Sequence, residues 1–257
     1  MSEGTKTTLQ RALLLASLLA SWALVARAGL WPPQLFPAPW EVADSLGAML
    51  ADGRLGSATW ASLRRLISGY CLSVAIGVPM GLGIARFRVL SRLIKPVVVS
   101  LQALPSICWL PLAVLWFGLS ESAIIFMVVM GSVLSVAIST EDGVHSIQPQ
   151  LLQVAGTLGI RGLRFVAGVL IPGAMPGIVT GLKLGWSFAW RALMAGELLY
   201  ASGGLGQLLA AGRQALDPAQ VIAVMAAIIT VGVLMDRALF RTLEHSVRRR
   251  WGLQLAT

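Results

Sequence analysis

Three ionisable residues lie inside one strongly apolar stretch of the sequence, at Lys183, Arg191 and Glu197. A charge at the centre of a bilayer costs ~2.5–3.5 kcal/mol on insertion scales, so such residues usually face a cavity or a partner. On a helix, Lys183 and Arg191 project within roughly 80° of each other, and Lys183 and Glu197 share nearly one face. Arg191 can offer an oxyanion a bidentate set of donors. This pattern predicts a translocation pathway that passes an anion; the alternative is a structural ion pair or a hydrogen bond to broken backbone in a neighbouring span.

The other chemistry-bearing residues form no recognisable catalytic or metal-binding pattern. Cys71 and Cys108 both lie in apolar stretches, where they are typical of small packing residues rather than of a disulfide framework or a metal site. His145 and His245 are far apart in the sequence, and two lone histidines rarely make a metal site. We therefore expect no metal and no catalytic residue.

The composition indicates what must position these charges. Of the 257 residues, 56% are apolar and 12% are charged, whereas a soluble domain carries about 25% charged residues. Several apolar stretches approach the ~20 residues that a helix needs to cross a bilayer. They lack the alternation of a barrel strand, and lipid accepts only helices or closed barrels. The sequence predicts an all-α, polytopic membrane protein, with residues 1–257 forming a single transmembrane domain.

Six transmembrane helices are expected, at about Leu9–Leu30, Ser62–Ile84, Pro96–Phe117, Ser122–Ser139, Gly173–Leu199 and Ala219–Met235. The first also resembles a cleavable signal peptide, because Ala26-Arg27-Ala28 follows its apolar core, although its flanks favour a retained anchor. Glycines in the second suit close helix packing in lipid. Pro105 and Pro111 should bend or break the third, since proline removes a backbone donor. Such a break is tolerated at membrane depth only beside protein or a water-filled cavity.

The net charge of +9 is placed mostly between and beyond the apolar stretches. Basic residues in such positions are typical of cytoplasmic loops, whereas a nucleic-acid site has a clustered basic face. We therefore expect no nucleic-acid partner and both termini in the cytoplasm. An external loop should cover about residues 31–60, with a short interfacial helix, and the longest cytoplasmic loop about residues 140–172. Glu141 and Asp142 precede the short helix expected in this second loop and are expected to cap or solvate that helix.

The cytoplasmic loop contains one short amphipathic pattern. Leu151, Ala155 and Leu158 fall on one helical face, and Gly159 is a natural place for that helix to end. Pro172 marks the start of the next span, because proline is tolerated in a first helical turn. A short helix of this kind can dock into a groove on a partner protein or can simply lie at the membrane interface, and the pattern leaves both readings open.

The same loop resembles the cytoplasmic signature of ABC importer permeases, which reads Glu-Ala-Ala, three residues, Gly, nine residues, Ile-x-Leu-Pro. Ala155, Gly159 and Pro172 match that signature at the required spacing. Gln153 and Val154 stand where the family has Glu-Ala, so Gln153 keeps the hydrogen-bonding capacity and lacks the charge. The stretches 35–39, 105–112 and 203–206 resemble the branch of this family that carries nitrate, alkanesulfonates, taurine and bicarbonate.

This resemblance implies a type I ABC importer permease in the inner membrane of a bacterium. Two permease subunits, identical or different, would pair in membrane lipid, and each would seat its loop helix on an ATPase subunit that binds ATP and Mg. A periplasmic or lipid-anchored binding protein would deliver a small anion, which crosses by alternating access. This chain shows no Gly-x4-Gly-Lys-[Ser/Thr] phosphate loop, so we expect it to be no enzyme and to hold no cofactor.

An ion-coupled secondary transporter is the alternative function. Such transporters favour paired half-repeats and intramembrane coupling sites. Only one acidic residue, Glu197, lies well inside an expected span, and no matching halves are evident in the sequence.

Overall fold

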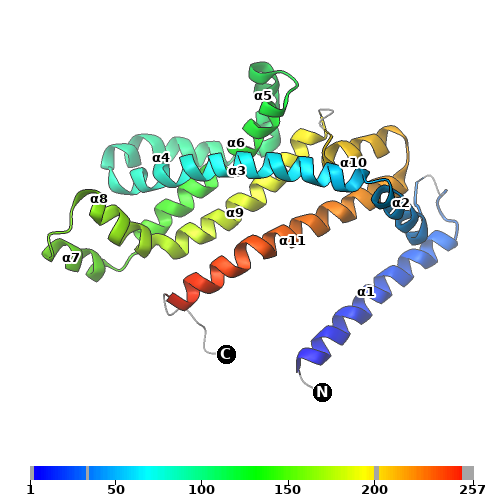
Figure 1. Cartoon of the computed structure of the whole chain (residues 1–257), viewed down its shortest axis with the longest axis horizontal. Helices are drawn as coiled ribbons and strands as arrows, with labels where there is room; N and C mark the ends of the chain where they lie inside the picture. The colour runs from blue at the N-terminus through cyan, green and yellow to red at the C-terminus, as the bar shows by residue number, and fades with distance from the viewer. Residues whose placement is uncertain (1–2, 33–34, 200–202, 251–257) are drawn as a thin grey trace.

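Helices make up nearly all of the chain that the computed structural model describes, which is residues 3–32, 35–199 and 203–250. The elements are α1 (Glu3–Arg27), α2 (Pro39–Ala51), α3 (Arg54–Arg86), α4 (Arg88–Gln102), η1 (Ser106–Trp109), α5 (Leu110–Phe117), α6 (Glu121–His145), α7 (Pro149–Thr157), α8 (Gly162–Phe165), η2 (Val166–Leu170), α9 (Ile171–Glu197), α10 (Leu205–Gln214) and α11 (Pro218–Arg250). Figure 1 shows their arrangement, and the all-α class expected from the sequence is confirmed.

Within the described residues, four helical stretches are long and apolar enough to cross a membrane: α3, α6, the continuous run from α8 to α9, and α11 up to Arg241. The bent pair formed by α4 with η1 and α5 makes a fifth if it counts as one broken span. The first of the six expected spans is the apolar part of α1, Ala12–Arg27, which is shorter than the other four. The structure therefore has four or five clear spans.

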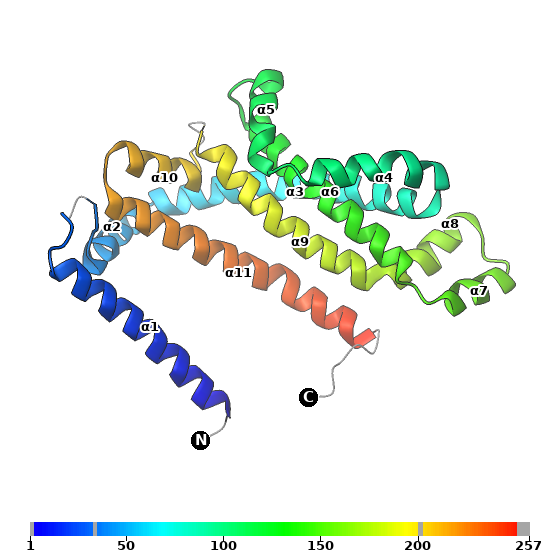
Figure 2. The same ribbon diagram turned by 180° about the vertical axis from the view of Figure 1, so that it is seen from behind.

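The core of the molecule is α6, which lies between α3 and α9 in both views (Figures 1 and 2). Within its most apolar window, 67% of α6 is buried, compared with 28% for α3. Glycines allow this approach, as expected for α3: a Cβ atom on Gly77 would lie 2.8 Å from the carbonyl oxygen of Val133. On the other side, a Cβ atom on Gly177 of α9 would lie 2.3 Å from the Cα atom of Gly143 in α6.

The third expected span is broken, as its prolines predict. α4 ends at Gln102, and the chain turns by 105° before η1 continues it. Pro105 directly precedes η1, where it can neither donate a backbone hydrogen bond nor continue a regular helix. Pro111 lies in the first turn of α5, a position that proline tolerates. The break therefore covers residues 103–105, with Pro105 as its last residue, and Pro111 is not part of it.

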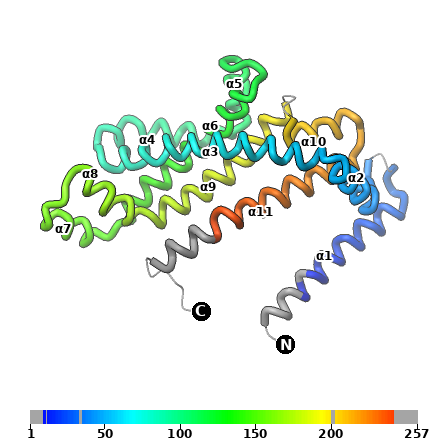
Figure 3. The backbone as a smooth tube through the Cα atoms, viewed as in Figure 1, coloured from blue at the N-terminus to red at the C-terminus, as the bar shows by residue number. Residues whose placement is uncertain are grey.

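The helices define two ends of the molecule. The backbone trace in Figure 3 shows α2 and α10 at one end, with α7 and α8 at the other. Two loops are shorter than expected from the sequence. α6 continues to His145, so the loop expected over 140–172 begins only at Ser146. α3 begins at Arg54, inside the loop expected over 31–60, which contains the short helix α2 as predicted. α3 and α6 thus both extend beyond the apolar stretches that predicted them, because backbone hydrogen bonds continue each helix into its polar flank.

Candidate functional site

The first candidate site is α7, the short helix that the resemblance assigns to the ATPase contact. Pro149 begins it, and Gly159 follows its end with a φ of +68°, a conformation that glycine adopts without strain. Only Ala155 is buried, whereas Gln153 and Val154 are exposed. The helix therefore presents an open face beyond the membrane-spanning helices. Leu151 and Leu158, expected on the same face as Ala155, are exposed as well.

A turn of π-helix, η2, joins the segment after α7 to α9. It ends one residue before Ile171, and Pro172 follows in the first turn of α9. Proline lacks the N–H group of a regular turn and its ring crowds the carbonyl group four residues earlier, so a wider turn fits there. As a result α8, η2 and α9 form one continuous helical run of 36 residues, Gly162–Glu197. A short link, residues 158–161, connects α7 to this run.

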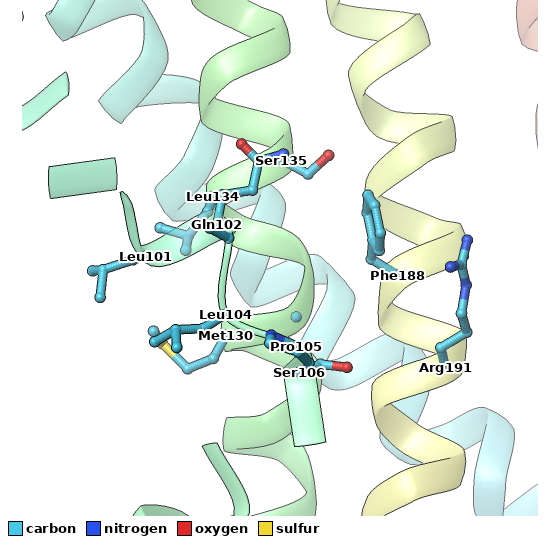
Figure 4. Close-up of a pocket in the computed structure, with 12 residues that line it drawn as sticks. Leu101, Gln102, Leu104, Pro105, Ser106, Met130, Leu134, Ser135, Phe188 and Arg191 are labelled. Carbon is cyan, nitrogen blue, oxygen red and sulfur yellow. The ribbon is translucent and has the colours of Figure 1, made fainter. Parts of the chain in front are cut away.

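The second candidate site is a cavity of about 320 Å³ beside the break in the third span. Its walls come from the end of α4, the break itself, α6 and α9. Figure 4 shows Gln102, Pro105 and Ser106 together with α6 residues on one side, and Phe188 and Arg191 of α9 on the other. The lining is mostly apolar with few polar groups, which is the usual composition of a small-molecule site.

Arg191 supplies the positive charge of this cavity. Its Nη2 atom donates a 3.1 Å hydrogen bond to Ser187 Oγ, and its guanidinium lies 5.0 Å from the centroid of the Phe188 ring. Its side chain is exposed, and within the described part of the chain no carboxylate forms a salt bridge with it. A guanidinium with open donors in a mostly apolar cavity can bind an anion.

Only two of the residues expected along the pathway meet at this cavity. Arg191 and Pro105 both line it, whereas Lys183, Glu197 and Pro111 do not. Lys183 is half-buried on α9, and Pro111 is in α5, beyond the break. Glu197 ends α9 in a separate, fully buried cluster. Lys183, Arg191 and Glu197 all lie on α9, but they lie at different heights along the helix and so do not reach the same cavity.

The buried carboxylate of Glu197 accepts hydrogen bonds from two other segments, α3 and the start of α10. Its Oε1 atom accepts a 2.9 Å hydrogen bond from Arg65 Nη1, and its Oε2 atom accepts bonds from Ser62 Oγ and the Gly206 backbone N–H. Ser62 Oγ in turn accepts a bond from the N–H group of Leu205. We call these five residues the Glu197 cluster. It joins α3, α9 and the start of α10 at one end of the molecule.

Sequence reasoning did not find the Glu197 cluster. Arg65 lies near the start of the second expected span, and the structure places it in α3 with its side chain 3% exposed. It also donates a 2.8 Å bond to Glu121 at the start of α6. Arg65 and Glu197 are 132 residues apart, so no local spacing could pair them. The sequence offered one signal for this pairing: Arg65 and Glu197 are opposite charges that lie in two separate apolar stretches.

A second buried carboxylate lies at the opposite end, one turn before α6 ends. Glu141 is 1% exposed, and its Oε1 atom accepts a 2.7 Å bond from Lys95 Nζ of α4. The same oxygen lies 3.2 Å from His145 Nε2. We call these three residues the Glu141 cluster. The expectation that Glu141 is a solvated residue of the cytoplasmic loop is wrong, because α6 continues past it and packs against α4 and α9.

Comparison with known proteins gives the family. Residues 74–249 match the family described as binding-protein-dependent transport system inner membrane component. A probable ABC transporter permease protein of Brucella melitensis is 31% identical over 221 residues, covering 86% of this chain and 89% of that protein. The taurine transport system permease protein of Escherichia coli is 31% identical over 237 residues, covering 89% and 86% of the two chains.

A solved structure agrees with the fold. A chain of the MetNI methionine ABC transporter, in an inward-facing conformation, superposes with a TM-score of 0.61 at 18% identity, covering 74% of this chain and 96% of that one. The expected type I ABC importer permease fold is thereby confirmed. ATP binding and hydrolysis are the task of a separate ATPase. The chain belongs to the binding-protein-dependent transport system inner membrane components, and it is the multi-pass inner membrane permease of an ABC transporter.

Proposed function

We propose that this permease imports a small anion, such as an alkanesulfonate, taurine, nitrate or bicarbonate, by alternating access. The observation that carries the proposal is Arg191, which lines the 320 Å³ cavity and has no carboxylate salt-bridge partner in the described chain. The name of the taurine permease of Escherichia coli supports the substrate class, because taurine carries a sulfonate.

The cavity has the chemistry that a small oxyanion needs. Arg191 provides charge and paired donors, and the side chains of Gln102, Ser106 and Ser135 add polar groups around an apolar lining. An anion gains from such a site because the guanidinium offers paired donors and a charge with no carboxylate bound to it in the described chain. The attraction must stay weak enough for release, so the permease guides the solute while an external binding protein selects it.

The test is uptake by the complex of permease, ATPase and binding protein in proteoliposomes. Arg191→Gln removes the charge, and we expect transport of a sulfonate, nitrate or bicarbonate to fall about tenfold or more, equivalent to ~1.4 kcal/mol. Arg191→Lys keeps the charge without the bidentate geometry and should retain part of the transport. Arg213→Gln, an exposed change on α10, is the matched control. Anion uptake at the wild-type rate by a well-assembled Arg191→Gln complex contradicts the proposed role.

The ATPase contact is proposed to be the exposed face of α7 with Gln153 and Val154, ended by Gly159. Gly159→Pro should uncouple or dissociate the complex, because proline is held near φ −65° and the native φ is +68°. ATP-driven uptake and co-purification of the ATPase are the measurements. Unchanged uptake by this variant contradicts the assignment of α7. Gly156→Ala is the matched control in α7, because an added Cβ atom there meets nothing within 4 Å. It should leave ATP-driven uptake unchanged.

The proposed orientation puts the end with α7 and α8 in the cytoplasm. Basic residues gather at this end on several elements, at Arg86, Arg88, Arg92, Arg161 and Arg164. Cytoplasmic segments carry such an excess of basic residues. α11 runs from the end with α10 back towards this end in both views, which supports a cytoplasmic C-terminus (Figures 1 and 2). Reporter fusions to the C-terminus distinguish the two orientations.

The quaternary proposal is two permease subunits, identical or different, which share one pathway. Support comes from the large apolar side chains that a single subunit leaves exposed beside the broken third span, among them Leu104, Leu115 and Trp116. Two ATPases and one binding protein complete the proposed importer. Mass measurement of the intact complex in detergent tests this composition.

A further inference from the structure

The Glu141 cluster joins the base of the α7 segment to a helix that is distant in sequence. Glu141 lies on the last turns of α6, and the cap of that helix at Ser146 leads within three residues to α7. Its carboxylate is bonded to Lys95, 46 residues earlier on α4. The ion pair therefore connects the moving part of the proposed cycle to the broken third span.

The carboxylate of Glu141 depends on this bond. Its Oε2 atom is buried and has no hydrogen-bond partner among the residues that the structure describes. A buried carboxylate that loses its cation carries a high desolvation cost, so Glu141 favours every conformation in which Lys95 follows it. His145 is 60% exposed and 3.2 Å away, and it shares the oxygen that Lys95 already occupies.

α4 carries one wall of the cavity that contains Arg191. Its last turn includes Leu101 and Gln102, and both line the cavity together with the break that follows. Lys95 stands two helical turns before Gln102 on the same helix. α9 carries the opposite wall and continues from α8 without interruption. Both walls are thus connected to the α7 segment, α9 by the chain itself and α4 by the Glu141 cluster.

We propose that the Lys95–Glu141 ion pair is the positioning contact that moves the α4 wall of the pathway together with the ATPase-driven α7 segment. The proposal rests on the proposed function. The ion pair touches neither the solute nor the nucleotide. It makes the two walls move as one, so its loss should leave ATP hydrolysis active while less solute is carried per ATP.

The experiment measures solute uptake and ATP hydrolysis together in proteoliposomes that contain the whole complex. Glu141→Gln and Lys95→Gln should each lower the ratio of solute to ATP about fivefold or more, which is the lower range of coupling between sites. Lys95→Arg retains the charge and should restore most of the ratio. Arg92→Gln, an exposed change one turn earlier on α4, is the matched control and should leave the ratio unchanged.

A double-variant cycle separates coupling from folding. If the two residues act through one contact, the Lys95→Gln, Glu141→Gln double variant should lose no more than either single variant. An unchanged ratio in both single variants overturns the proposal. Equal loss of uptake and hydrolysis, in step with the amount of assembled complex, also overturns it, because the pair is then only structural. A wild-type complex that imports no anion refutes the proposed function instead.

Discussion

The two buried glutamates, Glu197 and Glu141, are held in opposite ways. Both oxygens of Glu197 are bonded, and the side chains that donate to them, Ser62 and Arg65, are themselves buried. One oxygen of Glu141 receives all its side-chain bonds, and the donor Lys95 is 40% exposed. The other oxygen has no partner in the described chain. The side chains of the Glu197–Arg65 pair are both shielded from water, whereas the Glu141 cluster is open to water on the side of Lys95.

The difference indicates which end of the permease stays rigid. Both oxygens of the Glu197 carboxylate accept hydrogen bonds, from groups on α3 and at the start of α10, and such a buried network favours one relative placement of the elements it joins. The Glu197 cluster should therefore hold α3, α9 and α10 as one body. Lys95 is partly hydrated while it holds the Glu141 carboxylate, so its side chain can follow that carboxylate without first losing all of its water. The Glu141 cluster suits the end that moves during transport, next to α7.

The largest effect should come from Glu197→Gln. It leaves the guanidinium of Arg65 buried, with only Glu121 as its counterion, and breaking a buried pair costs about 3–5 kcal/mol. We expect a strongly lowered yield of folded protein, measured by size-exclusion chromatography, and a lower melting temperature in detergent. A melting temperature equal to that of the wild type shows that the Glu197 cluster is not the rigid end.

Gly204→Ala should have the next largest effect. An added Cβ atom would lie 2.2 Å from Glu197 Oε1, so the carboxylate or the loop before α10 must shift. Overpacking of this kind costs about 1–3 kcal/mol. The melting temperature should fall, but less than in Glu197→Gln. Gly56→Ala is the matched control, because an added Cβ atom there meets nothing within 4 Å. Equal melting temperatures for the two variants contradict close packing at Gly204.

Glu141→Gln should change stability much less than Glu197→Gln. The partner left behind is Lys95, which is 40% exposed and can be hydrated, so we expect a loss of about 1 kcal/mol or less. Thermal unfolding in detergent, measured side by side for the two glutamine variants, checks this order. A loss as large as that of Glu197→Gln removes the contrast between a rigid and a movable end.

The smallest effect should come from Asp52→Asn, before α3. The backbone N–H of Arg54, followed by its side chain, lowers the pKa of Asp52 below its usual range. Any stabilisation from this exposed pair is therefore present at neutral pH and is lost as the pH falls through that lowered pKa. We expect no measurable change of melting temperature at pH 7. A clear loss at pH 7 shows that exposed pairs matter as much as the buried clusters.

Much of the fold could be predicted from the sequence because it depends on neighbours along the chain. Apolar stretches of bilayer length gave the spans, with Pro105 at the break and Gly159 after α7. The same local information placed Arg191 in an apolar helix. It could not show that Pro105 and Arg191 line one cavity, since that depends on how α4, α6 and α9 pack.

The sequence by itself determined the class of protein, its helices, their breaks and the loop signature, because hydrophobic periodicity and proline or glycine geometry act over a few residues. Only the tertiary structure decided how the charges are paired. Arg65 meets Glu197 and Lys95 meets Glu141 across 132 and 46 residues. A charge in an apolar stretch must find a partner, but which partner it finds is set by the packing of distant helices.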